Sequence, residues 1–145
     1  MNLDQYVKPV FIYLFSLVSV TTILVYFLDL PTLLTNASHL VKQYYYTNYV
    51  SSFLLDIVLV AIYLGIASYI SQVSNFRTFF SQFAVVILTT LLISGAFFLY
   101  FTNTPKTSQF FSIWFHTVKH KAVIYDMFLV SSVFAVQTFL TKKLV

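Results

Sequence analysis

Four long, apolar stretches carry almost no charge, and they limit the possible folds more than any other feature of the chain. They cover residues 10–28, 50–71, 79–101 and 122–141. A helix of about 20 apolar residues crosses the roughly 30 Å hydrocarbon core of a bilayer. Only 8% of the residues are charged, whereas soluble domains carry about 25%. The sequence therefore predicts an all-α, polytopic membrane protein with four transmembrane helices.

Two shorter segments between the stretches have an amphipathic pattern. At 100° per residue, the apolar side chains of residues 33–45 share one arc and the polar ones the other, and residues 110–121 divide in the same way. We expect two amphipathic helices in the membrane interface. Aromatic side chains expected at headgroup level are Tyr44, Tyr45, Phe110, Phe111 and Trp114. Side chains expected to contact headgroups or to sense pH are His39, Lys42, His116, Lys119, His120 and Lys121.

The order of these segments occurs twice along the chain. Lys42, for example, returns as Lys119 in a similar local sequence, between one apolar stretch and the next. We therefore predict a single transmembrane domain over residues 1–145. It consists of two similar helix–interfacial helix–helix halves at about 8–72 and 78–141, with both chain ends on one side of the membrane.

A carboxylate lies inside the second and the fourth stretch. Asp56 and Asp126 are each followed by at least 14 uncharged residues. A charge within a transmembrane helix costs roughly 2.5–3.5 kcal/mol on insertion scales, so it calls for an explanation. One interpretation is that the two carboxylates face each other or a hydrated cleft and bind a cation or pass protons. The other is that they anchor helix ends through Ser52, Tyr125 or a nearby lysine.

Several kinds of chemistry lack the residues they need. The chain has no Cys, which excludes disulfides, thiolate metal sites and a Cys nucleophile. We predict no catalytic set and no cofactor. The basic residues are scattered, so no nucleic-acid surface is expected. His116 and His120 lie four apart, as on one helical face, but Lys119 and Lys121 would repel a metal ion, and we predict no metal site.

The last four residues bear on localisation. Lys142 and Lys143 precede Leu-Val at the end of the chain. The ending resembles the dilysine retrieval signal of endoplasmic reticulum membrane proteins, which would place both termini in the cytosol. The alternative is a pair of snorkelling lysines that closes a helix. The first stretch is expected to be an uncleaved span. Asn36-Ala37-Ser38 fits a glycosylation sequon, and its use is not predicted.

A short four-span chain, rich in Phe, Tyr, Asn and Lys, without Cys and with a dilysine-like end, resembles the small membrane proteins of large DNA viruses. Such viruses build an internal membrane from the endoplasmic reticulum. The resemblance lies in composition and layout. It implies a component of the virion inner membrane or of its assembly, which bridges membrane and capsid proteins or shapes the bilayer.

Three functions follow as hypotheses. The first is a non-enzymatic structural, assembly or membrane-shaping protein, in contact with the lipid bilayer and possible as a homo-oligomer. In this hypothesis Asp56 and Asp126 tie the halves together. The second is a small cation or proton channel or transporter that uses both carboxylates, with a hydrated path past Ser94 and Gln137. The third is an adaptor subunit of a larger membrane complex.

Overall fold

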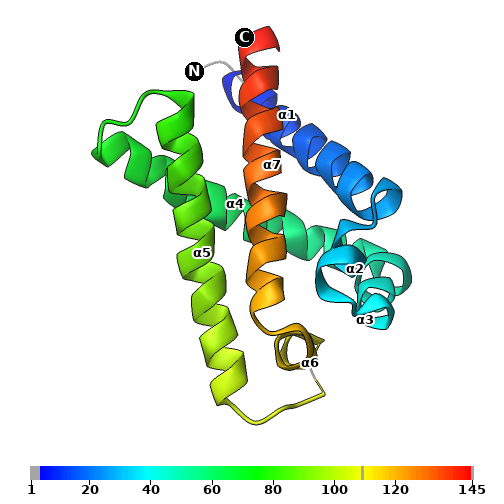
Figure 1. The fold of residues 1–145 in the computed structure, drawn as a ribbon. Coiled ribbons are helices and arrows are strands. Elements are labelled where there is room, and N and C mark those ends of the chain that lie inside the picture. The colour runs from blue at the N-terminus through cyan, green and yellow to red at the C-terminus, as the bar shows by residue number, and fades with distance from the viewer. Residues whose placement is uncertain (1–3, 109, 145) are drawn as a thin grey trace.

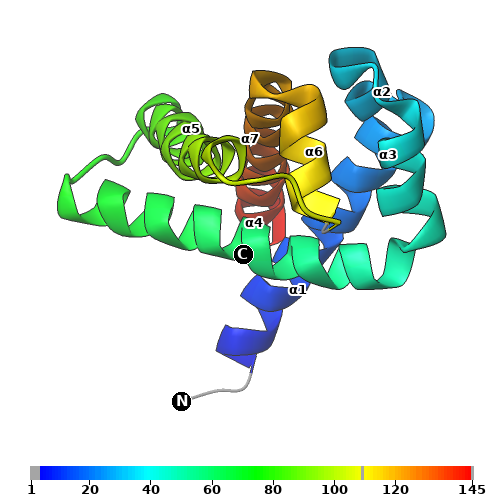
Figure 2. The ribbon, with the colours of Figure 1, turned by 90° about the horizontal axis from the view of Figure 1, so that it is seen from below.

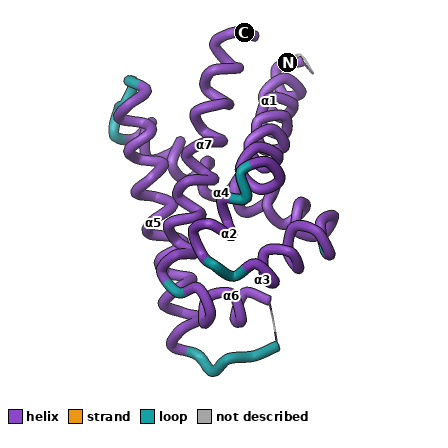
Figure 3. The backbone as a smooth tube through the Cα atoms, turned by 45° about the vertical axis from the view of Figure 1, so that its right-hand side comes forward, coloured by secondary structure: helices purple, strands orange, loops and turns teal. Residues whose placement is uncertain are grey.

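The computed structural model describes residues 4–108 and 110–144, and these residues form helices joined by short loops (Figure 3). The first half runs through α1 (Asp4–Thr21), a π-helix η1 (Thr22–Phe27), α2 (Leu30–Thr35), α3 (Ser38–Lys42), a second π-helix η2 (Gln43–Thr47) and α4 (Tyr49–Val73). The second half runs through α5 (Phe79–Asn103), α6 (Phe110–Val118) and α7 (His120–Leu144).

Among the residues that the structure describes, four segments are long and apolar enough to cross a bilayer. They are Val7–Phe27, Tyr49–Val73, Phe79–Asn103 and His120–Lys143, with mean hydropathies of 2.2, 2.3, 2.3 and 1.7. Each overlaps one of the four stretches expected from the sequence. The prediction of an all-α protein with four transmembrane helices is confirmed, and the chain is an integral membrane protein.

Helix α7 is the centre of the arrangement. Helix α5 runs beside it, α1 packs against it from another side, and α4 crosses behind α5 and α7 at a steep angle (Figures 1 and 2). The short helices α2, α3 and α6 gather at one end of the molecule. The start of α1 and the end of α7 lie at the other end (Figure 1). This placement follows from the two span pairs, each of which returns the chain to its starting side.

One face of α7 forms much of the core. Ala122, Tyr125, Leu129 and Val133 are buried, and their spacing of three to four residues places them on one side of the helix. Phe128, on another side, is 50% exposed. In a membrane protein such exposed apolar side chains meet lipid, so the burial pattern separates a packed face from an outer face.

The first predicted interfacial helix is not continuous. Helix α2 ends at Thr35, and the next residue, Asn36, has a left-handed φ of 57°. Asn adopts this conformation more readily than most residues, and it stops a helix. Helix α3 starts two residues later, and from Gln43 the chain continues in wider π turns. The amphipathic periodicity did not predict this break, because the break depends on one backbone angle.

The second predicted interfacial helix is also shorter than expected. Helix α6 ends at Val118, and Lys119 has a left-handed φ of 57° before α7 begins at His120. His116 and His120 therefore lie on different helices. The expectation that they share one helical face is wrong, because the reversal at Lys119 breaks the four-residue spacing.

The two halves differ in how their spans pack. In the second half α5 and α7 lie side by side along much of their length. In the first half α1 packs on α7 rather than along α4. A hydrogen bond from the Tyr13 hydroxyl to the Ile57 carbonyl, 2.6 Å long, joins α1 to α4. The similarity of the halves in sequence is thus not matched by similar packing of their spans.

Candidate functional site

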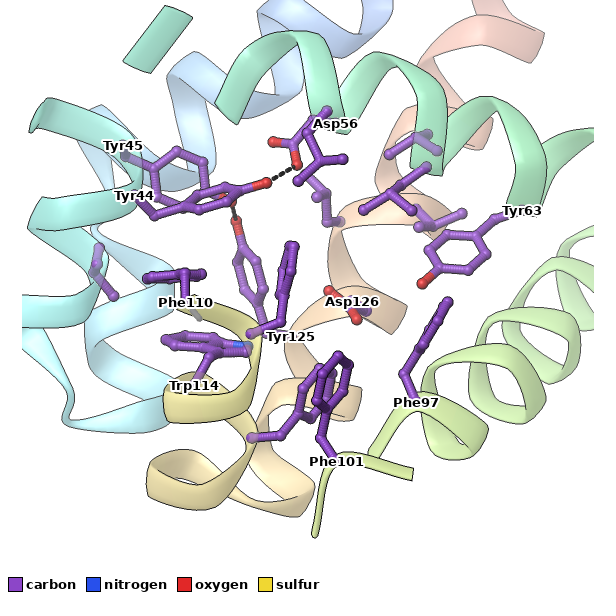
Figure 4. A pocket seen from close by; sticks show the side chains of 18 residues that line it. Tyr44, Tyr45, Asp56, Tyr63, Phe97, Phe101, Phe110, Trp114, Tyr125 and Asp126 are labelled. Atoms are coloured by element: carbon purple, nitrogen blue, oxygen red, sulfur yellow. Dashed lines mark hydrogen bonds between the residues drawn. The ribbon is translucent and has the colours of Figure 1, made fainter. Parts of the chain in front are cut away.

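A cavity of about 160 Å³ lies between α4, α5, α6, α7 and the π-helix η2. Figure 4 shows that Asp56 of α4 and Asp126 of α7 both reach it, although they lie in different halves of the chain. Ten of its lining residues are aromatic: Tyr44, Tyr45, Tyr63, Phe97, Phe101, Phe110, Phe111, Trp114, Phe115 and Tyr125. The site therefore combines two carboxylates with aromatic walls.

Asp56 belongs to the inward face of α4. Ser52, Asp56, Val60 and Tyr63 are all buried and follow helical spacing. The side chain of Asp56 is only 7% exposed, and the Tyr44 hydroxyl donates a 2.5 Å hydrogen bond to its Oδ1. A short bond to a carboxylate is typical of a charge-assisted pair. The carboxylate is thus held by a tyrosine that comes twelve residues earlier in the chain.

Asp126 has a different partner. The hydroxyl of Ser94, on α5, donates a 2.6 Å hydrogen bond to its Oδ2, and Ser94 is fully buried. The partners suggested by the sequence, Ser52 and Tyr125, do not donate side-chain bonds to the two carboxylates. The local sequence around each Asp could not reveal Tyr44 or Ser94, because both bonds depend on how separate helices pack.

Among the described residues, a side-chain hydrogen bond between the halves is made without a carboxylate. Asp56 and Tyr44 lie in the first half, and Asp126 and Ser94 lie in the second. Neither hydrogen bond to a carboxylate crosses from one half to the other, and the idea that the two carboxylates join the halves stays a prediction. The Tyr45 and Tyr125 hydroxyls, 2.5 Å apart, make the link across the halves beside the cavity.

Burial keeps Tyr44 and Tyr45 of η2 protonated. It raises the pKa of the Tyr44 hydroxyl well above its ordinary value, and the charge of Asp56 raises it further. Burial likewise raises the pKa of Tyr45, and Tyr125 adds to the effect. Tyr44 consequently remains a hydrogen-bond donor toward Asp56 over the whole physiological pH range.

The aromatic residues expected at headgroup level lie in an inward cluster. Tyr44 stacks on Phe110 with ring centroids 5.1 Å apart, and Phe110 stacks on Trp114 at 6.0 Å. Trp114 is only 9% exposed. Tyr45 is buried, and Phe111 packs partly buried against the same cluster. These side chains build a wall of the cavity, and their arrangement does not present them as a wedge to lipid.

The histidines and lysines named from the sequence lie outside the cavity. Exposed side chains are His39, Lys42, Lys119, His120, Lys142 and Lys143. His116 and Lys121 are partly exposed, and the His116 Nε2 lies 3.2 Å from the Thr104 carbonyl oxygen. None of the described residues that line the cavity is basic. Its charged groups are thus Asp56 and Asp126.

Sequence reasoning missed Tyr63, which completes the polar part of the cavity. Tyr63 is 5% exposed and lies seven residues after Asp56, two helical turns along the same face of α4. Figure 4 shows its hydroxyl directed into the cavity on the side of Asp126. In the part of the chain that the structure describes, this hydroxyl has no hydrogen-bond partner. Helical spacing from Asp56 was the pattern by which Tyr63 could have been found.

A second, more polar cavity of about 420 Å³ lies further along α4, α5 and α7. Its lining includes Gln72, Gln82, Gln137 and Thr141. Gln137 was considered in the sequence as part of a hydrated path, and here it reaches a cavity near the end of α7. The interface of these helices therefore has open space toward both of its ends.

Within residues 4–108 and 110–144, no group of three or more His, Cys, Asp or Glu side chains is placed to hold a metal ion. Comparison with protein-family models, with curated proteins and with solved structures gives no match to this chain. The geometry of the two cavities is accordingly the basis for assigning a function.

Proposed function

We propose that this membrane protein is a small cation or proton pathway in which Asp56 and Asp126 form the cation-binding site. The observation that carries the proposal is that both span carboxylates line one cavity without a basic residue among its described lining. Ionisable groups inside spans typically mark ion pathways and proton relays. The proposal includes no catalytic step.

The positions of the two cavities support a path along α4 and α7. Val60 and Val130 line the carboxylate cavity, and Leu64 and Phe134 line the second one. On each helix these residues are four positions apart, which is about one turn or roughly 5.4 Å. Successive turns of the same two helices therefore line the two cavities, and a connection between them would complete the path, with Lys142 at the lining of the second cavity.

Ion flux in liposomes tests the proposal. Purified protein is reconstituted, and the movement of protons, potassium and methylammonium is compared between the wild type and the Asp56→Asn/Asp126→Asn double variant. We expect the double variant to lower flux about tenfold or more, equivalent to roughly 1.4 kcal/mol or more. Asp→Asn keeps the size of the side chain, so insertion and helix content should not change.

Asp29→Asn is the matched control. Asp29 is exposed, lies outside the cavity and has a left-handed φ of 52° that Asn also tolerates. This variant should conduct like the wild type. Absence of flux from correctly inserted wild-type protein, or equal flux in the double variant, would contradict the proposal.

A structural or assembly role is the second candidate, and the exposed surface of the spans favours it. In the most apolar 18-residue segment of each candidate span, only 28–33% of the residues are buried within the protein. The remaining surface meets lipid, further copies of the chain or other membrane proteins. A homo-oligomer, an adaptor subunit of a larger complex and a component of a viral inner membrane all belong to this proposal. Mass measurement of the protein extracted in a mild detergent separates the first two from a monomer.

Two finer proposals concern sorting and origin. Lys142 and Lys143 are exposed, as a dilysine retrieval signal requires, and replacing both with serine should release the protein from the endoplasmic reticulum. The Nζ of Lys143 lies 5.8 Å from the centre of the Phe139 ring, the contact expected of a snorkelling lysine. Retention of the variant in that compartment would favour the snorkelling alternative. The similar order of segments in the sequences of the two halves supports a proposed origin by duplication, although their spans pack differently.

A further inference from the structure

We infer that the carboxylate cavity binds a methylated ammonium group, held by Asp56 and Asp126 and enclosed by aromatic rings. The inference rests on the proposed function and names the class of cation that the site prefers. Its basis is the pairing of two carboxylates with Tyr, Phe and Trp side chains around one small space. Quaternary ammonium ions are recognised in proteins by aromatic cages of this composition.

The lining is poorly suited to a hard metal ion. Calcium takes six to eight oxygen ligands, and magnesium usually keeps several waters. Here two carboxylates are the charged ligands, and most of the wall is aromatic carbon. A methylated ammonium ion distributes its charge over its methyl groups, so it loses less hydration and gains contact with ring faces. The walls therefore favour an organic cation over a small inorganic one.

The size of the cavity points to a headgroup rather than a larger molecule. Its volume of about 160 Å³ is below the roughly 300–1,000 Å³ typical of sites for drug-sized ligands. The space corresponds to about five waters at roughly 30 Å³ each. A trimethylammonium group with a short substituent is of this order.

Tyr63 provides an independent indication of a ligand. Its side chain is 5% exposed, and its hydroxyl points into the cavity without a hydrogen-bond partner among the described residues (Figure 4). The hydroxyl oxygen is reachable from the cavity, so a molecule held there can be its hydrogen-bond partner. A hydroxylated ammonium ion such as choline would satisfy the Tyr63 hydroxyl while its cationic end lies between Asp56 and Asp126.

Trp114 makes the inference directly measurable. It is the single Trp of the chain and lines the cavity, so its fluorescence reports on a cation near the rings. Full-length protein in a maltoside detergent is titrated with tetramethylammonium and with choline. Potassium and 3,3-dimethylbutan-1-ol, the uncharged isostere of choline, are titrated in parallel. We expect a saturable change with the two ammonium ions and a response at least about tenfold weaker with potassium and with the isostere.

Four variants and one control locate the site. Asp56→Asn and Asp126→Asn should each weaken tetramethylammonium binding about tenfold or more, because each removes a negative charge from a poorly hydrated space. Phe97→Leu removes one lining ring and should weaken it about threefold to tenfold. Phe80→Leu, at an exposed position outside the cavity, is the control. Tyr63→Phe should weaken choline binding more than tetramethylammonium binding.

Reconstitution separates the sources of the ammonium group. Tetramethylammonium is titrated into protein in phosphatidylcholine vesicles and in phosphatidylethanolamine-rich vesicles, whose headgroups are likewise zwitterionic but carry no methyl groups on nitrogen. Weaker apparent binding in phosphatidylcholine indicates that a lipid headgroup occupies the cavity, and equal binding indicates a free ammonium ion; both results support the inference.

An equal response to potassium or to the isostere would overturn the inference, as would unchanged binding in both Asp→Asn variants. The titrations of wild-type protein decide the matter even if a variant fails to fold. If flux depends on the two carboxylates but Trp114 does not respond to ammonium ions, the inference fails and the proposed function stands. If flux does not depend on the two carboxylates and Trp114 does not respond to ammonium ions, both the inference and the proposed function fail.

Discussion

Tyr45 of η2 and Tyr125 of α7 lie 80 positions apart in the chain, yet their hydroxyl oxygens are 2.5 Å apart and both side chains are buried. Tyr45 is held on its other side as well, because the Tyr26 hydroxyl donates a 2.7 Å hydrogen bond to its backbone carbonyl. This arrangement joins η1, η2 and α7 next to the carboxylate cavity. The Tyr45–Tyr125 hydrogen bond connects the two halves through neutral hydroxyl groups. Both carboxylates line the cavity beside it.

The Tyr45–Tyr125 pair should contribute to stability in a coupled manner. Tyr45→Phe or Tyr125→Phe alone leaves the remaining buried hydroxyl without its partner, and we expect each to destabilise the protein by about 1–3 kcal/mol. The double variant should be less destabilised than the sum of the two, since no hydroxyl is then left unpaired. Thermal unfolding in detergent measures the cycle. Additive losses would contradict the direct bond.

Loss of the hydroxyl groups that donate hydrogen bonds to Asp56 and Asp126 should affect ion flux more than it affects the stability of the protein. Tyr44→Phe and Ser94→Ala remove the hydrogen bonds to Asp56 and Asp126. Each loss should change flux through the reconstituted protein about threefold to tenfold, which corresponds to a bond of roughly 1 kcal/mol. Tyr49→Phe and Ser74→Ala, both at exposed positions, are the matched controls. Equal effects of the donor variants and their controls would show that these bonds do not serve the site.

Glycine at position 119 should stabilise the turn between α6 and α7. Lys119 has a φ of 57°, and the left-handed region costs an ordinary residue roughly 1–2 kcal/mol. Lys119→Gly should therefore raise the free energy of unfolding by about 1 kcal/mol, although part of the gain is offset by the greater freedom of the unfolded chain. Lys119→Ala retains the Cβ atom and serves as the control. A lower melting temperature for Lys119→Gly than for Lys119→Ala would be inconsistent with this turn.

Alkaline pH should unfold the protein through Tyr44 and Tyr45. The folded state raises the pKa of both hydroxyls, whereas unfolded tyrosine has a pKa of about 10. The contribution of Tyr44 and Tyr45 to the free energy of unfolding is fully present below about pH 10. It is lost as the pH rises further, because the two hydroxyls then ionise in the unfolded chain and stay protonated in the folded one. The loss is up to about 1.4 kcal/mol per pH unit for each group.

Melting temperatures between pH 8 and 11.5 check this dependence. Tyr44→Phe should make the decrease in melting temperature above pH 10 less steep. Tyr49→Phe, which removes the hydroxyl of an exposed tyrosine, is the control. A melting temperature that stays constant to pH 11.5 in the wild type would contradict the burial of these groups.

The fold class could be predicted from the sequence because length and hydropathy alone select spans. Residues 50–71 and 79–101, for example, coincide closely with α4 and α5. The ends of the interfacial helices were harder to predict. They depend on left-handed residues such as Asn36 and Lys119, and an amphipathic pattern continues through a break without showing it.

The site was only partly predictable for the same kind of reason. Asp56 and Asp126 stood out because charges inside spans are rare. That they share a cavity, and that Tyr44, Ser94 and Tyr63 accompany them, depends on how α4, α5 and α7 cross. No local sequence pattern encodes how these helices cross. Tyr63 could have been predicted, because it follows Asp56 by seven residues and so lies on the same face of α4.

Single-cysteine labelling is the most direct test that both carboxylates serve one cation-accessible cavity. The natural chain has no Cys, so Asp56→Cys, Asp126→Cys and the exposed control Asp29→Cys each carry one thiol. Rates are measured in liposomes with a trimethylammonium methanethiosulfonate and with its sulfonate analogue. We predict that both cavity thiols react with the cationic reagent, and about tenfold or more faster than with the anionic one, because the remaining carboxylate attracts the cation. A cavity thiol that fails to react while Asp29→Cys does, or equal rates with both reagents, would contradict a shared cation site.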